Sequence, residues 1–205
     1  MKVTSNSKSY LIVDDFFNAT EQKEIWKELE FLTDPTKLLP PEKTGAAFIN
    51  DELLKKNQAI FLDTFYGNRE HSKILNNCMK MLSPEMFSIF DDMDGEFRYA
   101  EGSNLDTTLL SYYEDTDYYK PHTDEAVLTF LYWCYKEPKS FEGGDLLLPE
   151  LDADIEVKNN RLVVFPSYRL HSVTPLSMNI KNEPFSTFGR YCITKFLFVT
   201  PSNTK

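Results

Sequence analysis

The chain has 205 residues and a formal net charge of −10, and hydrophobic residues make up 41% of it. That is enough apolar material for one folded domain, residues 1–205. The acidic balance argues against a protein that tracks nucleic-acid phosphates. No apolar run approaches the roughly 18 residues of a membrane span. Asp14 and Asp15 interrupt the apolar start that a signal peptide needs. Three widely spaced cysteines favour free thiols, so we expect a cytoplasmic protein.

The first third of the chain predicts a strand, a helix and a loop. Residues 9–17 (SYLIVDDFF) are typical of a short strand. Asn18 follows as a helix N-cap, with Glu21 three residues later as its capping-box partner. Apolar residues then recur at helical spacing, which predicts a helix over 19–32. The proline-containing stretch 33–47 is predicted to be a loop.

A second helix is predicted over 69–82, and Pro84 opens a shorter helical piece. From residue 97 onward, short runs rich in β-branched and aromatic residues alternate with turn signals. These runs are FRYA, TTLLSYY, AVLTFLYWCY, GGDLLLP, RLVVFP and RYCITKFLFV. We therefore expect a helical support region, 1–96, followed by an all-β body, 97–199. The predicted fold class is mainly β with N-terminal helices (α+β), built as a jelly-roll double sheet.

Two of the three histidines lie in segments that favour metal binding. His122 and Asp124 form a His-x-Asp step, which places both side chains on one face of an extended segment. His171 follows closely behind the apolar run RLVVFP. Two histidines and one carboxylate are the ligand set of a facial triad, which suits Fe(II) and leaves open positions on the metal. The alternative is a polar turn whose histidines never meet in space. His71, in a polar stretch, is expected to be a solvated surface residue.

Several motifs in one order resemble the Fe(II)/2-oxoglutarate-dependent dioxygenases. Within them, the order is most similar to the prolyl 4-hydroxylase-like branch. The motifs are Tyr113, Tyr119-x-x-His122-x-Asp124, Gly143-Gly144-Asp145-Leu146, Phe165-Pro166-Ser167, Leu170-His171-Ser172-Val173-Thr174-Pro175 and Gly189-Arg190-Tyr191. The similarity covers about residues 97–199 and extends to the opening strand and capped helix. It implies a double-stranded β-helix, in agreement with the strands read from the sequence.

The resemblance implies roles for individual residues. His122, Asp124 and His171 would bind Fe(II), and Arg190 would pair with the distal carboxylate of 2-oxoglutarate. Tyr113 matches a tyrosine that often contacts this cosubstrate, although the neighbouring Tyr112 is the alternative. The remaining candidates are Trp133 and Thr194 for the cosubstrate and Tyr119 and Phe196 for the substrate pocket.

Strand periodicity bears on two of these assignments. A period of two places Arg190, Thr194 and Phe196 on one face of the last strand and Lys195 on the other. On the strand within AVLTFLYWCY, the same rule turns Trp133 inward in one register and Tyr132 in the other. The gap from His171 to Arg190 is longer than the resemblance implies, which predicts a longer loop between the two strands. We expect this insertion, 176–189, and the loop 33–47 to wall the substrate groove.

The sequence thus predicts a 2-oxoglutarate-dependent dioxygenase that needs Fe(II), with ascorbate as a further cofactor in keeping with the resemblance. It would hydroxylate a peptidyl substrate, with proline the first candidate, and release succinate and CO2. One alternative is the same chemistry on a free small molecule such as an amino acid. The non-enzyme alternative is a metal-free jelly-roll binding module. Neither a nucleic-acid partner nor a membrane is expected.

Overall fold

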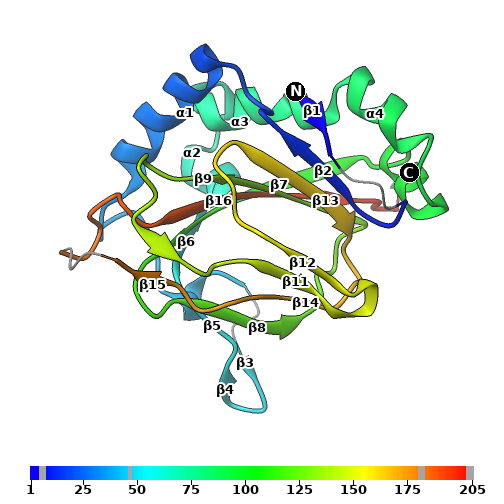
Figure 1. The fold of residues 1–205 in the computed structure, drawn as a ribbon. Coiled ribbons are helices and arrows are strands. Elements are labelled where there is room, and N and C mark those ends of the chain that lie inside the picture. The colour runs from blue at the N-terminus through cyan, green and yellow to red at the C-terminus, as the bar shows by residue number, and fades with distance from the viewer. Residues whose placement is uncertain (5–7, 46–47, 180–182, 202–205) are drawn as a thin grey trace.

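Two antiparallel sheets form the body of the protein in the structure, a computed structural model that describes residues 1–4, 8–45, 48–179 and 183–201. Figure 1 shows the larger sheet beneath the helices and the smaller sheet below it. Along the larger sheet, the order is β1 (Lys2–Val3), β2 (Leu11–Asp14), β13 (Arg161–Pro166), β9 (Leu128–Cys134), β16 (Arg190–Phe198), β7 (Leu105–Tyr113) and β6 (Gln58–Phe61). The two sheets and the helices that cover the larger one make the predicted α+β jelly roll.

The smaller sheet carries the strands closest to the histidines. Its order is β12 (Ala153–Ile155), β11 (Leu146–Leu148), β14 (His171–Val173), β8 (Tyr118–His122) and β5 (Lys55–Lys56). Two further pairs join β3 (Phe48–Ile49) to β4 (Glu52–Leu53) and β10 (Phe141–Glu142) to β15 (Ser177–Met178). The β3–β4 hairpin projects from the body on the side of the smaller sheet (Figure 1).

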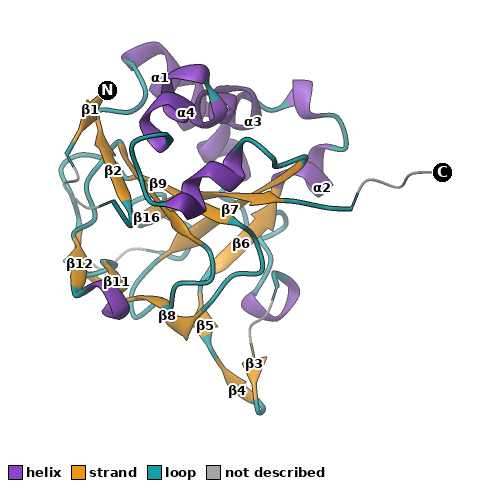
Figure 2. Ribbon diagram, turned by 90° about the vertical axis from the view of Figure 1, so that its right-hand side faces the viewer, coloured by secondary structure: helices purple, strands orange, loops and turns teal. Residues whose placement is uncertain are grey.

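The helices cover the outer face of the larger sheet (Figure 2). They are α1 (Ala19–Leu32), α2 (Leu62–Tyr66), α3 (Lys73–Cys78) and α4 (Pro84–Phe90). Helix α1 confirms the predicted 19–32, because the Asn18 side chain accepts hydrogen bonds from the N–H groups of Thr20 and Glu21. The Asn18 N–H in turn donates to the Glu21 carboxylate at 2.7 Å, which completes the capping box. None of the helices described is long and apolar enough to cross a membrane.

Short 3₁₀ helices lie between the longer elements, and some of them occupy segments for which the sequence predicted a continuous helix or a strand. They are η1 (Pro41–Lys43), η2 (Arg69–His71), η3 (Met79–Leu82), η4 (Gly95–Ala100) and η5 (Pro149–Leu151). The continuous helix predicted over 69–82 is wrong, because Ser72 is extended and caps a new helix, α3, through its hydroxyl. The same hydroxyl donates to the buried Glu28 carboxylate of α1 at 2.6 Å. The strand predicted at FRYA is also wrong, because that segment lies in η4.

The division into a helical region and a β body needs a second correction. Strands β5 and β6 lie within the region predicted to be helical, and each extends a different sheet. β6 pairs with β7, and β5 pairs with β8. Neither strand is long enough to give an alternating pattern, so only their pairing partners define them. The first part of the chain therefore contributes directly to the barrel walls.

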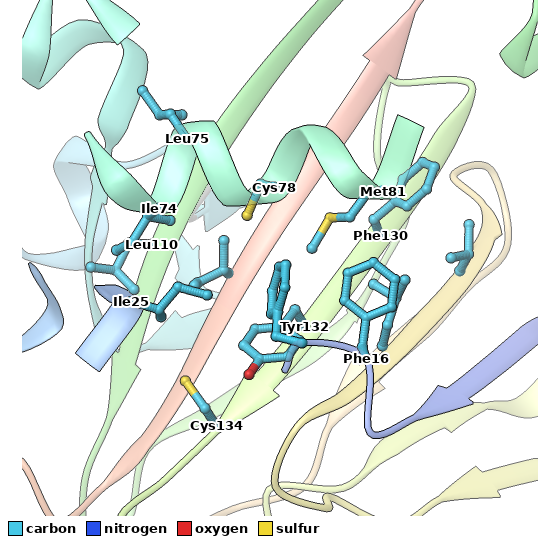
Figure 3. Close-up of a cluster of buried hydrophobic side chains, with 14 of the residues drawn as sticks. Phe16, Ile25, Ile74, Leu75, Cys78, Met81, Leu110, Phe130, Tyr132 and Cys134 are labelled. Carbon is cyan, nitrogen blue, oxygen red and sulfur yellow. The ribbon is translucent and has the colours of Figure 1, made fainter. Parts of the chain in front are cut away.

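Strand alternation on β9 separates the helix-side core from the interior between the sheets. Phe130, Tyr132 and Cys134 face the helices, where they pack with residues such as Ile25 and Met81 (Figure 3). Leu131 and Trp133 point the other way, into the cluster between the two sheets. The three cysteines of the chain are buried and unpaired. The helix layer thus fixes the larger sheet and leaves its inner face for the site.

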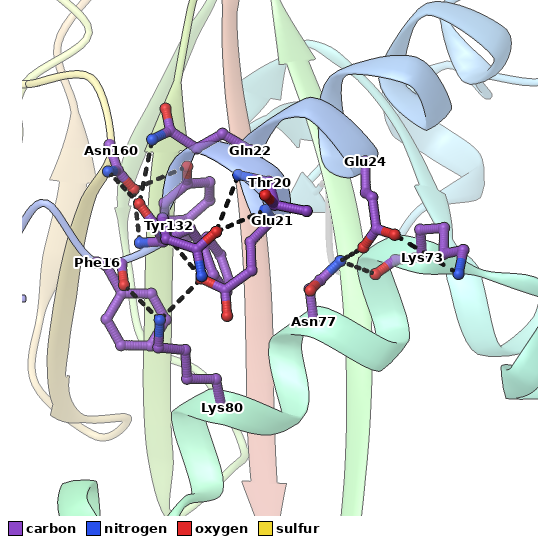
Figure 4. Close-up of polar contacts among 12 residues, drawn as sticks. Phe16, Thr20, Glu21, Gln22, Glu24, Lys73, Asn77, Lys80, Tyr132 and Asn160 are labelled. Carbon is purple, nitrogen blue, oxygen red and sulfur yellow. Dashed lines mark hydrogen bonds and ion pairs between the residues drawn. The ribbon is translucent and has the colours of Figure 1, made fainter.

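Asn160 ties the start of α1 to the sheet (Figure 4). It adopts a left-handed conformation with φ of 59° just before β13 and is 7% exposed. Its side-chain amide donates to the Phe17 carbonyl at 2.8 Å and its oxygen accepts from the Phe17 N–H at 2.9 Å. The Tyr132 hydroxyl donates to the same oxygen. One side chain therefore satisfies the backbone of the β2–α1 junction.

We predict that Asn160→Ala lowers the free energy of unfolding by about 2–4 kcal/mol, because it leaves the buried Phe17 N–H and carbonyl unpaired. Asn160→Gly loses the same bonds but tolerates the positive φ, so it is expected to be slightly less damaging. Urea unfolding followed by circular dichroism measures both. The neighbouring Asn159→Ala serves as the control. A loss below about 0.5 kcal/mol for Asn160→Ala would contradict this role.

Candidate metal centre

Antiparallel pairing brings the two predicted histidines together. His122 is the last residue of β8 and His171 is the first of β14, and the two are direct partners in the strand register. Their rings lie 4.1 Å apart between centroids. Asp124 follows two residues after β8, where its N–H donates to the Ser167 carbonyl at 2.9 Å. The His-x-Asp pair and a histidine 47 residues further along the chain therefore meet at the end of the smaller sheet.

The hydrogen bonds of both histidines leave the same ring nitrogen free. The Nδ1 of His122 bonds to the Lys120 carbonyl at 2.9 Å, and that of His171 bonds to the Arg169 carbonyl at 2.9 Å. Because a carbonyl only accepts, each Nδ1 carries the proton and each Nε2 keeps a lone pair. Both Nε2 atoms face Asp124. A backbone carbonyl thus sets the tautomer, as it does for many metal-bound histidines.

The distances among the three groups suit one metal ion. His122 Nε2 lies 3.8 Å from Asp124 Oδ1, and His171 Nε2 lies 3.5 Å from Asp124 Oδ2. All three ligand atoms lie within 4.8 Å of one another. Ligands about 2.0–2.2 Å from a shared ion are separated by roughly 3–4.4 Å, depending on the angle between them. The group therefore fits a 2-His-1-carboxylate site.

Thr129 orients the carboxylate, although the sequence had not singled it out for this role. Its hydroxyl donates to Asp124 Oδ2 at 2.7 Å and contacts the Ser167 hydroxyl at 2.8 Å. Thr129 lies at the start of β9 and is fully buried. Burial raises the pKa of Asp124, and the neighbouring His171 and this hydrogen bond oppose the increase. The carboxylate is thus held in a fixed orientation.

Burial also keeps the first histidine neutral. It lowers the pKa of His122 to about 3, and the neighbouring His171 lowers it further. The Tyr119 ring stacks on the His122 ring with centroids 3.5 Å apart. Neutral imidazole is the form that binds a metal, so no proton has to leave His122 at neutral pH.

The three groups open onto a cavity of about 480 Å³ between the two sheets. Arg190, at the start of β16, lines this cavity and is 1% exposed. Its guanidinium carbon lies 4.6 Å from the Tyr113 ring centre and 5.6 Å from the Trp133 ring centre. Among the described residues, neither its Nε nor its Nη1 has a hydrogen-bond partner. A buried cation with free donors needs an anion.

Gly144 makes the room that Arg190 occupies. It has a φ of +75°, and a Cβ there would lie 3.0 Å from Arg190 Cδ and 2.4 Å from Leu176 Cδ1. A larger residue would push the guanidinium out of place, besides straining the backbone.

The structure places the other predicted residues on both faces of their strands. Tyr113, Thr194 and Phe196 line the cavity with Arg190, and so does Tyr119 of β8. Tyr112 instead joins the helix-side core, where its hydroxyl donates to Glu114 at 3.0 Å. Lys195 points away from the cavity and pairs with Asp106.

Trp133 takes the inward position on β9, and Tyr132 takes the outward one. The Trp133 indole N–H is buried beside the Cys192 thiol, which is a weak acceptor. It has no oxygen or nitrogen partner among the described residues. The Trp133 ring lies near the Arg190 guanidinium, but Trp133 is not among the residues that line the cavity.

Lys55 is a charged residue of the cavity that sequence reasoning missed. It lies on the two-residue strand β5, lines the cavity and is 2% exposed. Its ammonium group donates to the Thr44 carbonyl at 2.5 Å and lies 5.4 Å from the Tyr119 ring centre. Burial lowers the pKa of Lys55 to about 8, and the Asp124 charge opposes the decrease, so the group is mostly cationic at pH 7. No local sequence pattern marks it.

The two predicted groove walls differ. Thr44 and Gly45 of the loop 33–47 line the cavity, while residues 46–47 lie outside the described part of the chain. None of the described residues of the insertion 176–189 lines it, so that expectation is wrong for this part. Ser177 and Met178 pair with β10, and the Ser140 hydroxyl donates to the Phe188 carbonyl. Residues 180–182 are outside the described part.

Two bacterial proteins resemble part of this chain in sequence. An uncharacterized PKHD-type hydroxylase of Synechocystis sp. is 33% identical over 78 residues, which cover 35% of this chain and 24% of that protein. A PKHD-type hydroxylase of Maricaulis maris is 29% identical over 92 residues, which cover 40% of this chain and 42% of that protein. The match therefore spans less than half the length of either relative.

Solved structures share the fold. A prolyl-4-hydroxylase of Pseudomonas putida superposes with a TM-score of 0.57 at 16% identity, covering 94% of each chain. A prolyl hydroxylase of Trichoplax adhaerens, solved with a peptide fragment of a hypoxia inducible factor, has a TM-score of 0.62 at 15% identity. That match covers 94% of this chain and 84% of the other. At these identities the likeness concerns the fold alone.

Residues 108–198 match the sequence profile of the 2OG-Fe(II) oxygenase superfamily. This stretch runs from β7 through β16 and contains the two histidines, Asp124 and Arg190. The sequence match, the shared fold and the geometry of the three ligands agree. Over residues 108–198, less than half of its length, the chain is thus similar to the 2OG-Fe(II) oxygenase superfamily.

Proposed function

We propose that this protein is an Fe(II)- and 2-oxoglutarate-dependent dioxygenase that hydroxylates a peptidyl substrate, with proline the first residue to test. The observation that carries the proposal is the buried Arg190, whose free N–H groups share a cavity with two histidines and a carboxylate. An unpaired buried guanidinium destabilises a purely structural core, whereas the carboxylate of a cosubstrate would pair with it.

The donor set fits iron. His122, Asp124 and His171 would hold Fe(II) through two Nε2 atoms and one carboxylate oxygen. Bound together, Fe(II) and 2-oxoglutarate supply the activation of dioxygen, with release of succinate and CO2. The part played by this chain is geometric: carbonyls fix both histidine tautomers, and Thr129 fixes the carboxylate. The side chains of the two sheets line the cavity and restrict the access of water from these sides.

The wall around Arg190 fits 2-oxoglutarate. The guanidinium can bind a carboxylate through two parallel hydrogen bonds, and it lies between two aromatic rings that restrict its movement. Thr194 lines the same cavity and offers a further O–H donor. The Tyr113 ring centre lies 4.6 Å from the guanidinium carbon, so this ring restricts the movement of the group.

A peptidyl substrate is supported by fold and by the pocket lining. The fold neighbours include prolyl hydroxylases, one of them solved with a peptide. Tyr119 and Phe196 line the same cavity and give flat apolar surfaces suited to a pyrrolidine ring.

We predict that Asp124→Ala weakens Mn(II) or Fe(II) binding by at least about 100-fold, because it removes the one anionic ligand of the site. Anaerobic isothermal titration calorimetry measures the affinity. Glu125→Ala, which removes the adjacent exposed carboxylate, is the matched control and should leave the affinity nearly unchanged. Equal affinity for Asp124→Ala and wild type would refute the proposed metal site.

We predict that Arg190→Ala weakens 2-oxoglutarate binding to the Mn(II)-loaded protein by about 2–5 kcal/mol, because the cosubstrate loses a buried bidentate charge pair. Mn(II) affinity itself should change little. Arg169→Ala is the control, since Arg169 pairs with Glu150 on the surface side. Unchanged cosubstrate affinity in Arg190→Ala would show that another residue binds the carboxylate.

We predict that the Fe(II)-loaded protein, given 2-oxoglutarate and ascorbate, produces a proline-containing peptide heavier by one oxygen atom. Succinate should appear in equal amount. Mass spectrometry of peptide pools and of free proline, incubated in parallel, measures both products. Oxygen incorporation into free amino acids alone would contradict the peptidyl assignment and favour the small-molecule alternative.

A further inference from the structure

Lys55 is a second buried cation in the cavity that the proposed metal and cosubstrate sites do not use. Strand β5 pairs antiparallel with β8, and Lys55 lies directly opposite Tyr119 in the register. The Tyr119 ring stacks on the His122 ring and lies 5.4 Å from the Lys55 ammonium, so one aromatic ring neighbours both groups. Lys55 therefore belongs to the wall of the site and not to the distant core.

The charge of Lys55 has no carboxylate partner among the described residues. Within the described part of the chain, its ammonium group makes one hydrogen bond, to the Thr44 carbonyl, although it has three donors. The residues outside the described part (5–7, 46–47, 180–182 and 202–205) include no Asp or Glu. Asp124 acts on Lys55 through its charge, but the two groups are not within 4.0 Å. Among the described residues, two of the three ammonium donors thus have no hydrogen-bond partner.

Lys56, the next residue on the same strand, has a charge that is paired with a carboxylate. Lys56 points to the opposite face and its Nζ lies 3.2 Å from the Asp117 carboxylate. It also donates to the Asp115 carbonyl at 3.2 Å and to the Thr116 hydroxyl. Thus the exposed Lys56 pairs with a carboxylate, although solvent already stabilises its charge. The buried Lys55 has no such carboxylate among the described residues.

The charges of the loaded site would leave Lys55 unbalanced. If the proposed function holds, the charges of Fe(II), Asp124, the two carboxylates of 2-oxoglutarate and Arg190 cancel. The other acid that lines the cavity, Glu125, is exposed to solvent. One positive charge, on Lys55, then remains in a cavity of low dielectric. The net charge of −10 is spread over the surface and is screened beyond about 8 Å at physiological ionic strength.

We propose that Lys55 binds a carboxylate of the substrate, so that the substrate of this site is an acid. The carboxylate belongs either to a free amino acid or to the acidic side chain or C-terminus of a peptide. This inference rests on the proposed function and adds the substrate class to it. The competing explanation is that Lys55 only fastens the Thr44 loop to the barrel wall through its one hydrogen bond.

The test compares acids with their amides on the same protein. The probes are free proline, aspartate and glutamate with their amides, and acetyl-capped proline peptides containing Asp or Asn, Glu or Gln, and a free or amidated C-terminus. Calorimetry without oxygen, on protein loaded with Mn(II) and 2-oxoglutarate, measures binding. Succinate release with Fe(II) measures turnover. The variants are Lys55→Met, Lys55→Arg and, as the matched control, Lys56→Met.

We expect at least one acid probe to bind the wild type about 10- to 100-fold more tightly than its amide partner. Lys55→Met should abolish this preference, Lys55→Arg should retain most of it, and Lys56→Met should retain all of it. The affinities for Mn(II) and 2-oxoglutarate should change less than about twofold in Lys55→Met. Preference among the free amino acids or among the peptides identifies the source of the carboxylate.

Two results would overturn the inference while leaving the proposed function intact. One is the absence of any acid preference in a wild-type protein that binds Mn(II) and 2-oxoglutarate. The other is an acid preference that survives in Lys55→Met, as a purely structural lysine would allow. A wild type that binds no 2-oxoglutarate would instead refute the proposed function, and this inference with it.

Discussion

The antiparallel pairing of His122 with His171 is the contact on which the site depends. It joins β8 to β14 and sets two imidazoles side by side. Asp124 then reaches them because its backbone bonds to Ser167, in the turn that leads into β14. The proposed metal site is therefore a consequence of strand register. A shift of one residue in either strand would turn one imidazole to the other face of the sheet.

The larger sheet supplies the second half of the site through alternation. On β16, Arg190, Cys192, Thr194 and Phe196 line the cavity, while the residues between them pack toward the helices or pair with Asp106. On β9, Trp133 faces inward for the same reason. The helix layer buries the opposite face of these strands. The helices thus serve the chemistry indirectly, because they hold the sheet whose inner face carries the donors.

Local spacing made much of this arrangement predictable. Some features depend only on residues that are close together in the sequence, so they can be predicted without knowledge of the tertiary structure. These are the His-x-Asp step, the strand that follows it and the period of two on the last strand. The helix over 19–32 was predictable because its cap is local. The prediction of one helix over 69–82 was wrong because the Ser72 hydroxyl caps a new helix within this range. The same hydroxyl bonds to Glu28, which is far away in the sequence.

Lys55 shows what the sequence could not reveal. It lies on a strand of two residues next to another lysine, and only pairing with β8 separates the buried one from the exposed one. Thr129 likewise acquires its role from contacts with Asp124 and Ser167 that no spacing rule predicts. The metal ligands therefore follow from motifs, while the groups that would orient them and recognise a substrate follow from the assembled sheets.

A crystal structure grown without oxygen, in the presence of Mn(II) and 2-oxoglutarate, tests the central claim most directly. The account predicts an anomalous peak about 2.0–2.3 Å from His122 Nε2, His171 Nε2 and an Asp124 oxygen. It also predicts the distal carboxylate of 2-oxoglutarate within hydrogen-bond distance of Arg190. Metal bound elsewhere, or a cosubstrate carboxylate that does not contact Arg190, would contradict it.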